Sequence, residues 1–153
     1  MRINGKILIA IVGFVIVAGA LGLGKLGGFA LIKEFYPGNA AHQVTVTDVA
    51  KDVQTLKHQT RLPKTLDNYT ELVDIRTDGR AVVFVHRLTV QANPSKAYEW
   101  LTAVRRNMLR LAYSNKSMPK AMNQGVVFRY QYADSIGFNV GSFDIGGKDC
   151  ADA

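Results

Sequence analysis

The sequence is poor in the residues that build disulfide frameworks and metal centres. Cys150 is the only cysteine among 153 residues, which excludes an internal disulfide and any cysteine-rich zinc site. The three histidines, His42, His58 and His86, are too widely spaced for a metal-binding motif. No strand is followed by a glycine-rich phosphate loop, and no paired carboxylates or Ser/His/Asp order stand out. We therefore expect no cofactor and no enzymatic activity.

Acidic residues are absent from residues 1–33, and this shapes the charge of the whole chain. The formal net charge is +7, a value that could suggest nucleic-acid binding. Four of the 19 basic residues lie in residues 1–33, which leaves 15 basic residues against all 12 acidic ones in residues 34–153. The remainder of the chain is therefore only weakly basic, and we expect no nucleic-acid partner.

The start of the chain is dominated by an uncharged run. Residues 7–24 contain no charged side chain, and the sequence stays largely apolar as far as residue 32. A helix of eighteen residues spans about 27 Å, close to the roughly 30 Å hydrocarbon core of a bilayer. This predicts one transmembrane helix within residues 1–33, which contacts the lipid bilayer through residues 7–32.

A signal peptide cleaved after Ala20 is the alternative for the same segment. Residues 1–6 resemble a basic leader region, and Ala18-Gly19-Ala20 resembles a cleavage site. Arg2 and Lys6 favour a cytoplasmic N-terminus, so that under either interpretation the C-terminal domain lies across the membrane.

Glycine is frequent within this apolar segment. The spacing of Gly24 and Gly28 would let a second membrane helix approach closely, although membrane helices are in general rich in glycine. Of the two interpretations, ordinary glycine enrichment is favoured. The glycines that would line such a helix contact are Gly13, Gly19, Gly24 and Gly28.

The rest of the chain divides into a linker, a folded domain and a short tail. Tyr36-Pro37-Gly38-Asn39 breaks the first helix, which predicts a linker over residues 34–44. Thr45 or Thr47 can then cap a helix that ends near Thr60. The predicted domain covers residues 45–150 and the predicted tail residues 151–153.

Two pairs of β-rich runs flank a long helical pattern. Asp78-Gly79 joins the first pair into a hairpin, and the turn at Asp134-Ser135-Ile136-Gly137 joins the second. We therefore expect an α+β fold, a four-stranded antiparallel sheet with helices on one face, preceded by one N-terminal transmembrane helix. The strands are predicted at residues 69–77, 81–90, 126–133 and 138–145, and the helices at residues 93–115 and 119–123.

The long helix carries a basic group that is a candidate for partner binding. Arg106 and Arg110 share one face at i, i+4, and Arg105 lies beside them. These side chains can be solvated, can dock on an acidic partner or can contact anionic lipid head groups. Trp100 lies on the same helix and fits an interface or the core equally well.

His86 and Cys150 are the remaining candidates for chemistry. His86 shares a strand face with apolar residues, so a buried structural histidine is favoured over a ligand or a switch. Cys150 is open to three interpretations, which are a structural or unreactive thiol, an intermolecular disulfide and a nucleophile. Of these, the first is favoured, because no histidine is placed beside it by the sequence.

Several motifs resemble a widespread group of small bacterial envelope proteins over residues 45–150. Members are exported or membrane-anchored, and their α+β layout is similar to that of type II secretion pilotins, which bind and localise a secretin subunit. In that group the last cysteine usually pairs with one near the end of the long helix, where Tyr113 stands here. The matching segments are Thr60–Lys64, Leu111–Asn115, Gly125–Tyr132, Gly141–Phe143 and Cys150.

Together these features predict a binding protein of the bacterial envelope. The favoured function is a single-pass, membrane-anchored accessory, assembly or localisation subunit of an envelope membrane complex. It would lie in the inner membrane with a cytoplasmic N-terminus and a periplasmic domain, and would bind subunits of that complex. The alternative is a cleaved, soluble periplasmic protein that acts as a pilotin-like chaperone or as an immunity or inhibitor protein.

Overall fold

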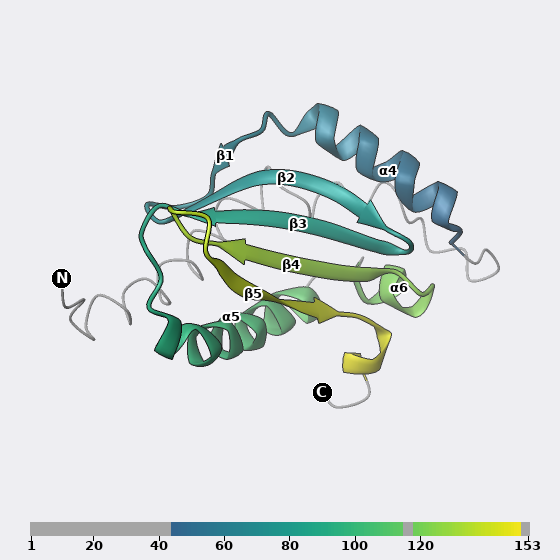
Figure 1. Ribbon diagram of the computed structural model, residues 1–153. Helices are drawn as coiled ribbons and strands as arrows, with labels where there is room; N and C mark the ends of the chain where they lie inside the picture. The colour runs from purple at the N-terminus through teal and green to yellow at the C-terminus, as the bar shows by residue number, and fades with distance from the viewer. Residues whose placement is uncertain (1–43, 115–117, 151–153) are drawn as a thin grey trace.

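A mixed five-stranded sheet with three helices forms the part of the chain that the computed structural model describes, residues 44–114 and 118–150 (Figure 1). The strands lie in sequence order across the sheet. They are β1 (Lys64–Thr65), β2 (Thr70–Asp78), β3 (Ala81–Leu88), β4 (Val127–Ala133) and β5 (Asn139–Ile145). The helices are α4 (Val46–Gln59), α5 (Pro94–Ser114) and α6 (Met118–Asn123), and a 3-10 turn, η2 (Gly147–Cys150), follows β5.

The α+β class and both predicted hairpins are confirmed, but the prediction of a four-stranded antiparallel sheet is wrong. A fifth strand, β1, pairs with β2 through only two residues, which is too short for an alternating pattern to reveal. In addition, β3 and β4 are parallel, whereas every other neighbouring pair is antiparallel. Parallel pairing follows from the crossover. Helices α5 and α6 return the chain to the end of the sheet at which β3 began, so β4 runs in the same direction as β3.

Local sequence signals explain where the two long helices begin. In front of α4, Thr45 Oγ1 accepts a hydrogen bond from the Asp48 amide (3.2 Å), and Asp48 Oδ2 accepts one from the Thr45 amide (2.9 Å). This capping box satisfies two amides that would otherwise lack partners. In front of α5, Asn93 Oδ1 accepts from the Ser95 amide (3.1 Å), and Pro94 occupies the first helical position.

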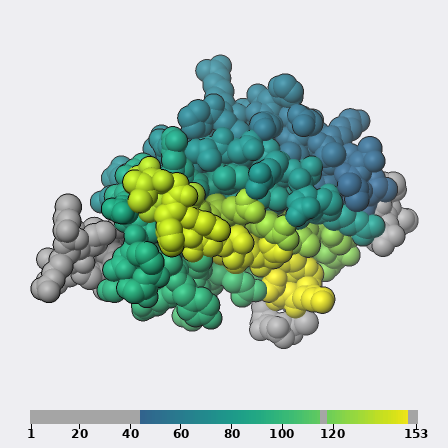
Figure 2. Space-filling view, in the orientation of Figure 1, coloured from purple at the N-terminus to yellow at the C-terminus, as the bar shows by residue number. Residues whose placement is uncertain are grey.

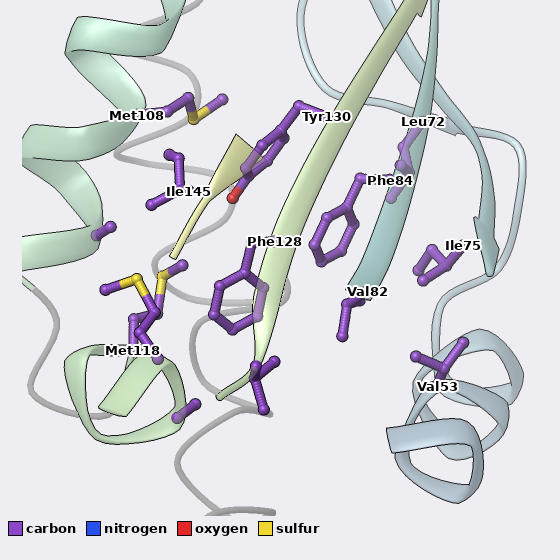
Figure 3. Close-up of a cluster of buried hydrophobic side chains, with 14 of the residues drawn as sticks. Val53, Leu72, Ile75, Val82, Phe84, Met108, Met118, Phe128, Tyr130 and Ile145 are labelled. Carbon is purple, nitrogen blue, oxygen red and sulfur yellow. The ribbon is translucent and has the colours of Figure 1, made fainter. Parts of the chain in front are cut away.

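One hydrophobic cluster joins the three helices to the same face of the sheet (Figure 3). Alternate residues of the strands point into it, and burial of each large apolar side chain contributes about 1.5–3 kcal/mol. At the centre of this cluster, aromatic rings on neighbouring strands stack on one another. The ring centroid of Tyr130 lies 5.4 Å from that of Phe84 and 5.2 Å from that of Phe143. The largest fully buried side chains include Phe128, Ile75, Met118 and Ile145.

Asp134 joins the turn between β4 and β5 to the loop that leads into α5. Its side chain is buried, yet Oδ1 accepts hydrogen bonds from the amides of Ile136 (3.0 Å) and Phe138 (2.8 Å). Oδ2 accepts from the amide of Ala92 (3.0 Å). Burial by itself would raise the pKa of this carboxyl, but the backbone donors outweigh it and lower the pKa below its usual value.

Replacement of this carboxylate should destabilise the fold. Asp134→Ala leaves three partly buried amides without an acceptor, so the melting temperature is expected to fall by several degrees. Thermal unfolding followed by circular dichroism measures this. Ser135→Ala, at the exposed neighbouring position, is the matched control and should leave the melting temperature unchanged. Equal melting temperatures for Asp134→Ala and the parent chain would contradict the assigned role.

None of the described helices combines the length and the apolar character that crossing a membrane requires. The longest, α5, carries Lys96, Glu99 and three arginines. The predicted transmembrane segment falls on residues 1–33 and therefore lies outside the described residues, as do the predicted packing glycines Gly13, Gly19, Gly24 and Gly28. The predicted division into segment, linker and domain stays a prediction.

Candidate functional site on the outer face of helix α5

Helix α5 is held on the sheet by one side and exposes the other. Its buried residues repeat every four positions, which is the spacing of a single helical stripe. Gly141 of β5 lies against α5, where a Cβ atom would meet the end of the Leu101 side chain. The face opposite the stripe therefore points away from the core. The buried stripe consists of Trp100, Val104, Met108 and Ala112.

Arg106 and Arg110 lie on this outer face, one helical turn apart. Both side chains are exposed. Arg110 Nη2 donates to Asn107 Oδ1 (3.2 Å), a neutral neighbour on the same helix. Among the ion pairs formed within the described residues, neither arginine takes part. The two charges therefore lie on one exposed helical face, as their spacing indicates, and their role in partner binding stays a prediction.

The environment of Arg105 differs from that of Arg106 and Arg110. Its guanidinium forms an ion pair with Asp149 of η2, and its side chain is only 41% exposed. Asp149 Oδ2 also accepts a hydrogen bond from the Gly146 amide (2.8 Å). Arg105 thus connects the turn after β5 to α5, and it is the least available of the three arginines predicted for partner binding.

Trp100 belongs to the core. Its side chain is buried, and its ring meets the ring of Tyr132 edge-on, with a centroid distance of 5.1 Å and an interplanar angle of 87°. Of the two interpretations that the sequence left open, the packing role matches this position. Trp100 packs α5 against the sheet. The exposed part of the candidate site therefore consists of Arg106 and Arg110.

Arg129 and Arg87, on the opposite face of the sheet, are already paired with carboxylates. Arg129 on β4 donates from Nε to Asp144 Oδ1 (2.8 Å) and from Nη1 to Asp78 Oδ2 (2.6 Å), and both contacts raise its pKa. Arg87 and Glu71 form a further cross-strand pair at 2.7 Å. Sequence reasoning missed these networks, because a partner across strands is known only once the register is known.

His86 is a buried histidine within an aromatic stack. Its ring lies 4.6 Å from that of Tyr132 and 6.1 Å from that of Tyr130, at interplanar angles of 15° and 20°. Within the described part of the chain Nδ1 has no hydrogen-bond partner. Burial lowers the pKa of His86 to about 4, despite backbone carbonyls that favour the charged form. Its place in the core agrees with the favoured structural interpretation.

A metal site finds no support in the part of the chain that the structure describes. No three histidine, cysteine, aspartate or glutamate side chains gather there in a way that could hold an ion. The side chain of Cys150 and the whole of His42 lie outside the described residues. The three interpretations of Cys150 therefore stay open.

His86 should make the stability of the fold depend on pH. The unfolded chain takes up a proton near pH 6.5, whereas native His86 does so only near pH 4. Between these values the unfolded state binds more protons, so the free energy of unfolding should fall as the pH falls, by at most about 1.4 kcal/mol per pH unit. Urea unfolding of the parent chain and of His86→Phe measures the difference.

The difference between the two chains isolates this histidine, because both share every carboxylate that titrates at low pH. In His86→Phe the part of the slope between pH 6.5 and 4 that His86 contributes should disappear. His58→Gln, at an exposed histidine, is the matched control and should keep the slope of the parent chain. Parallel slopes in the parent chain and His86→Phe would show that His86 does not titrate in this way.

Comparisons with known proteins identify the fold and no sequence family. No family model matches the chain, and no curated protein matches it in sequence. Among solved structures, a candidate secreted protein from Pseudomonas aeruginosa matches with a TM-score of 0.58 and 10% identity. The match covers 72% of this chain and 99% of that one.

Two pilotins of type II secretion systems have similar structures. EpsS from Vibrio vulnificus matches with a TM-score of 0.54 and 11% identity over 80% of this chain and 97% of that one. AspS from Vibrio cholerae matches with a TM-score of 0.51 and 15% identity over 69% of this chain and 91% of that one. The chain therefore has a pilotin-like α+β fold, as the resemblance implied.

These findings overturn the predicted localisation in a bacterial inner membrane with a single pass. The similar structures are secretion pilotins and a candidate secreted protein, and no described helix can cross a bilayer. That prediction depended on the apolar run of residues 7–32 and, for its orientation, on Arg2 and Lys6. Eighteen uncharged residues are long enough for a membrane helix, but an apolar N-terminal segment is also typical of an export signal. Hydropathy was therefore unable to decide between a membrane helix and an export signal.

Proposed function

We propose that this chain is a pilotin-like accessory protein that binds a subunit of a bacterial envelope complex through the outer face of α5. The fold supports this proposal, because two of the similar structures are pilotins of type II secretion systems. The chain is proposed to act by binding and not by catalysis. Of the two functions that the sequence predicted, the pilotin-like chaperone is the better supported.

The observation that carries the proposed site is the contrast between paired and unpaired arginines. Arg87, Arg105 and Arg129 each form an ion pair within the described residues. Arg61, Arg76, Arg80, Arg106 and Arg110 do not, and of these five only Arg106 and Arg110 lie at i, i+4 on one exposed helical face. Two such guanidinium groups can bind carboxylates in a bidentate manner, so the proposed partner surface is an acidic segment.

Charge reversal on this face should weaken assembly. The full chain, tagged at its C-terminus and expressed at its natural level, is isolated in mild detergent with its partner. In Arg106→Glu combined with Arg110→Glu, the captured partner is expected to fall at least about tenfold, because attraction to an acidic segment becomes repulsion. Quantitative mass spectrometry of the captured material measures the loss.

A matched control distinguishes the site from the net charge. Lys51→Glu combined with Arg61→Glu changes the charge by the same amount at exposed positions in and after α4, and it should retain the partner. Thermal unfolding should be unchanged in both double variants. Equal capture by the two variants would reject the α5 face as the docking surface. Absence of any stoichiometric partner from the parent chain would reject the accessory function itself.

A further inference from the structure

Glu99 of α5 differs from the other acidic residues in the part of the chain that the structure describes. It is exposed, and within the described residues it forms neither an ion pair nor a hydrogen bond. Every other acidic side chain there has a polar or charged partner. Those residues are Asp48, Asp52, Asp67, Glu71, Asp74, Asp78, Asp134, Asp144 and Asp149.

Glu99 lies on the same outer face of α5 as the two unpaired arginines. It precedes Arg106 by seven residues, or nearly two full turns, so the two positions face the same way and lie about 10 Å apart along the axis. The turn between them carries Thr102 and Ala103, which are too small to separate the two charges. In Figure 2 the green atoms of α5 lie uncovered along the lower margin of the molecule. The face therefore presents its charges in a fixed order, with Glu99 first and the arginines after it.

The neighbouring charges leave this order unchanged. Lys96 is exposed three residues before Glu99, but no ion pair joins the two within the described residues, and exposed pairs at this spacing are weak. Farther along the helix, Arg105 is engaged by Asp149, whose side chain is only 21% exposed. The negative charge of Glu99 is thus available to a partner, as are the two positive charges that follow it.

The charges have a defined direction because α5 is fixed on the sheet. Trp100 directly follows Glu99 and is buried against Tyr132, and Val104 and Met108 are buried in the turns that follow. A partner that binds to such a rigid row of charges does not have to order it first. The spacing of the charges can therefore select how the partner lies.

We propose that this charge order sets the orientation of the partner on α5. The inference rests on the proposed function and adds that the partner segment carries a basic residue opposite Glu99, about 10 Å from the acidic residue opposite Arg106. In this orientation all facing charges attract. A segment turned end for end would place its basic residue on the arginines and an acidic residue on Glu99, and both contacts would repel. Glu99 is thus a residue that determines specificity.

Reversal of the charge at Glu99 tests the proposal, because two kinds of partner predict opposite results. With a uniformly acidic partner segment, Glu99→Lys would add a third basic side chain to the face and raise capture. With the proposed charge order, repulsion of the partner's basic residue should lower the captured partner at least about tenfold. Quantitative mass spectrometry of the tagged full chain, isolated in mild detergent, measures the change. Glu99→Gln should also lower capture, by a smaller factor, and serves if lysine disturbs the helix.

Gln54→Lys combined with Gln59→Lys is the matched control. It adds two positive charges at exposed positions of α4 and should leave capture unchanged. Equal or greater capture by Glu99→Lys than by the parent chain would overturn the charge order and leave the arginine site in place. Equal losses in Glu99→Lys and in the control would reflect net charge and would also overturn it. A parent chain that captures no partner would reject the accessory function and this inference with it.

Discussion

Parallel pairing of β3 and β4 is the constraint on which the rest of this structure depends. It places Phe84 opposite Tyr130 and His86 opposite Tyr132, so that one face of the sheet carries a continuous row of rings. It also requires a long crossover, which α5 and α6 supply. Because α5 must cover the aromatic row with one side, its other side has to face outward, and that is where Arg106 and Arg110 lie.

The two faces of the sheet use charge in different ways. On the face away from the helices, Arg129 forms ion pairs with Asp144 and Asp78, and such exposed pairs contribute little to stability. On the helix-covered side, the exposed arginines of α5 have no acidic partner within the described residues. A docking surface needs charges that are not already neutralised, and Arg106 and Arg110 meet that condition as a pair on one helical face.

Asp134 connects the turn between β4 and β5 to the start of α5. By accepting hydrogen bonds from Ala92, Ile136 and Phe138, it fixes the entry to α5 and the turn between β4 and β5 together. The direction of α5, and hence of its arginines, is thereby coupled to that turn.

Local signals in the sequence determined the α+β class, the ends of α4 and α5 and both hairpins, because capping residues and Asp-Gly turns act over a few neighbouring positions. They also placed Arg106 and Arg110 on one exposed helical face. Only the tertiary structure decided that β3 and β4 are parallel, that Trp100 is buried and that Arg105 is paired while its neighbour is not. Each of these depends on residues far apart in the chain, whose contacts exist only after the sheet register and the helix crossover are in place.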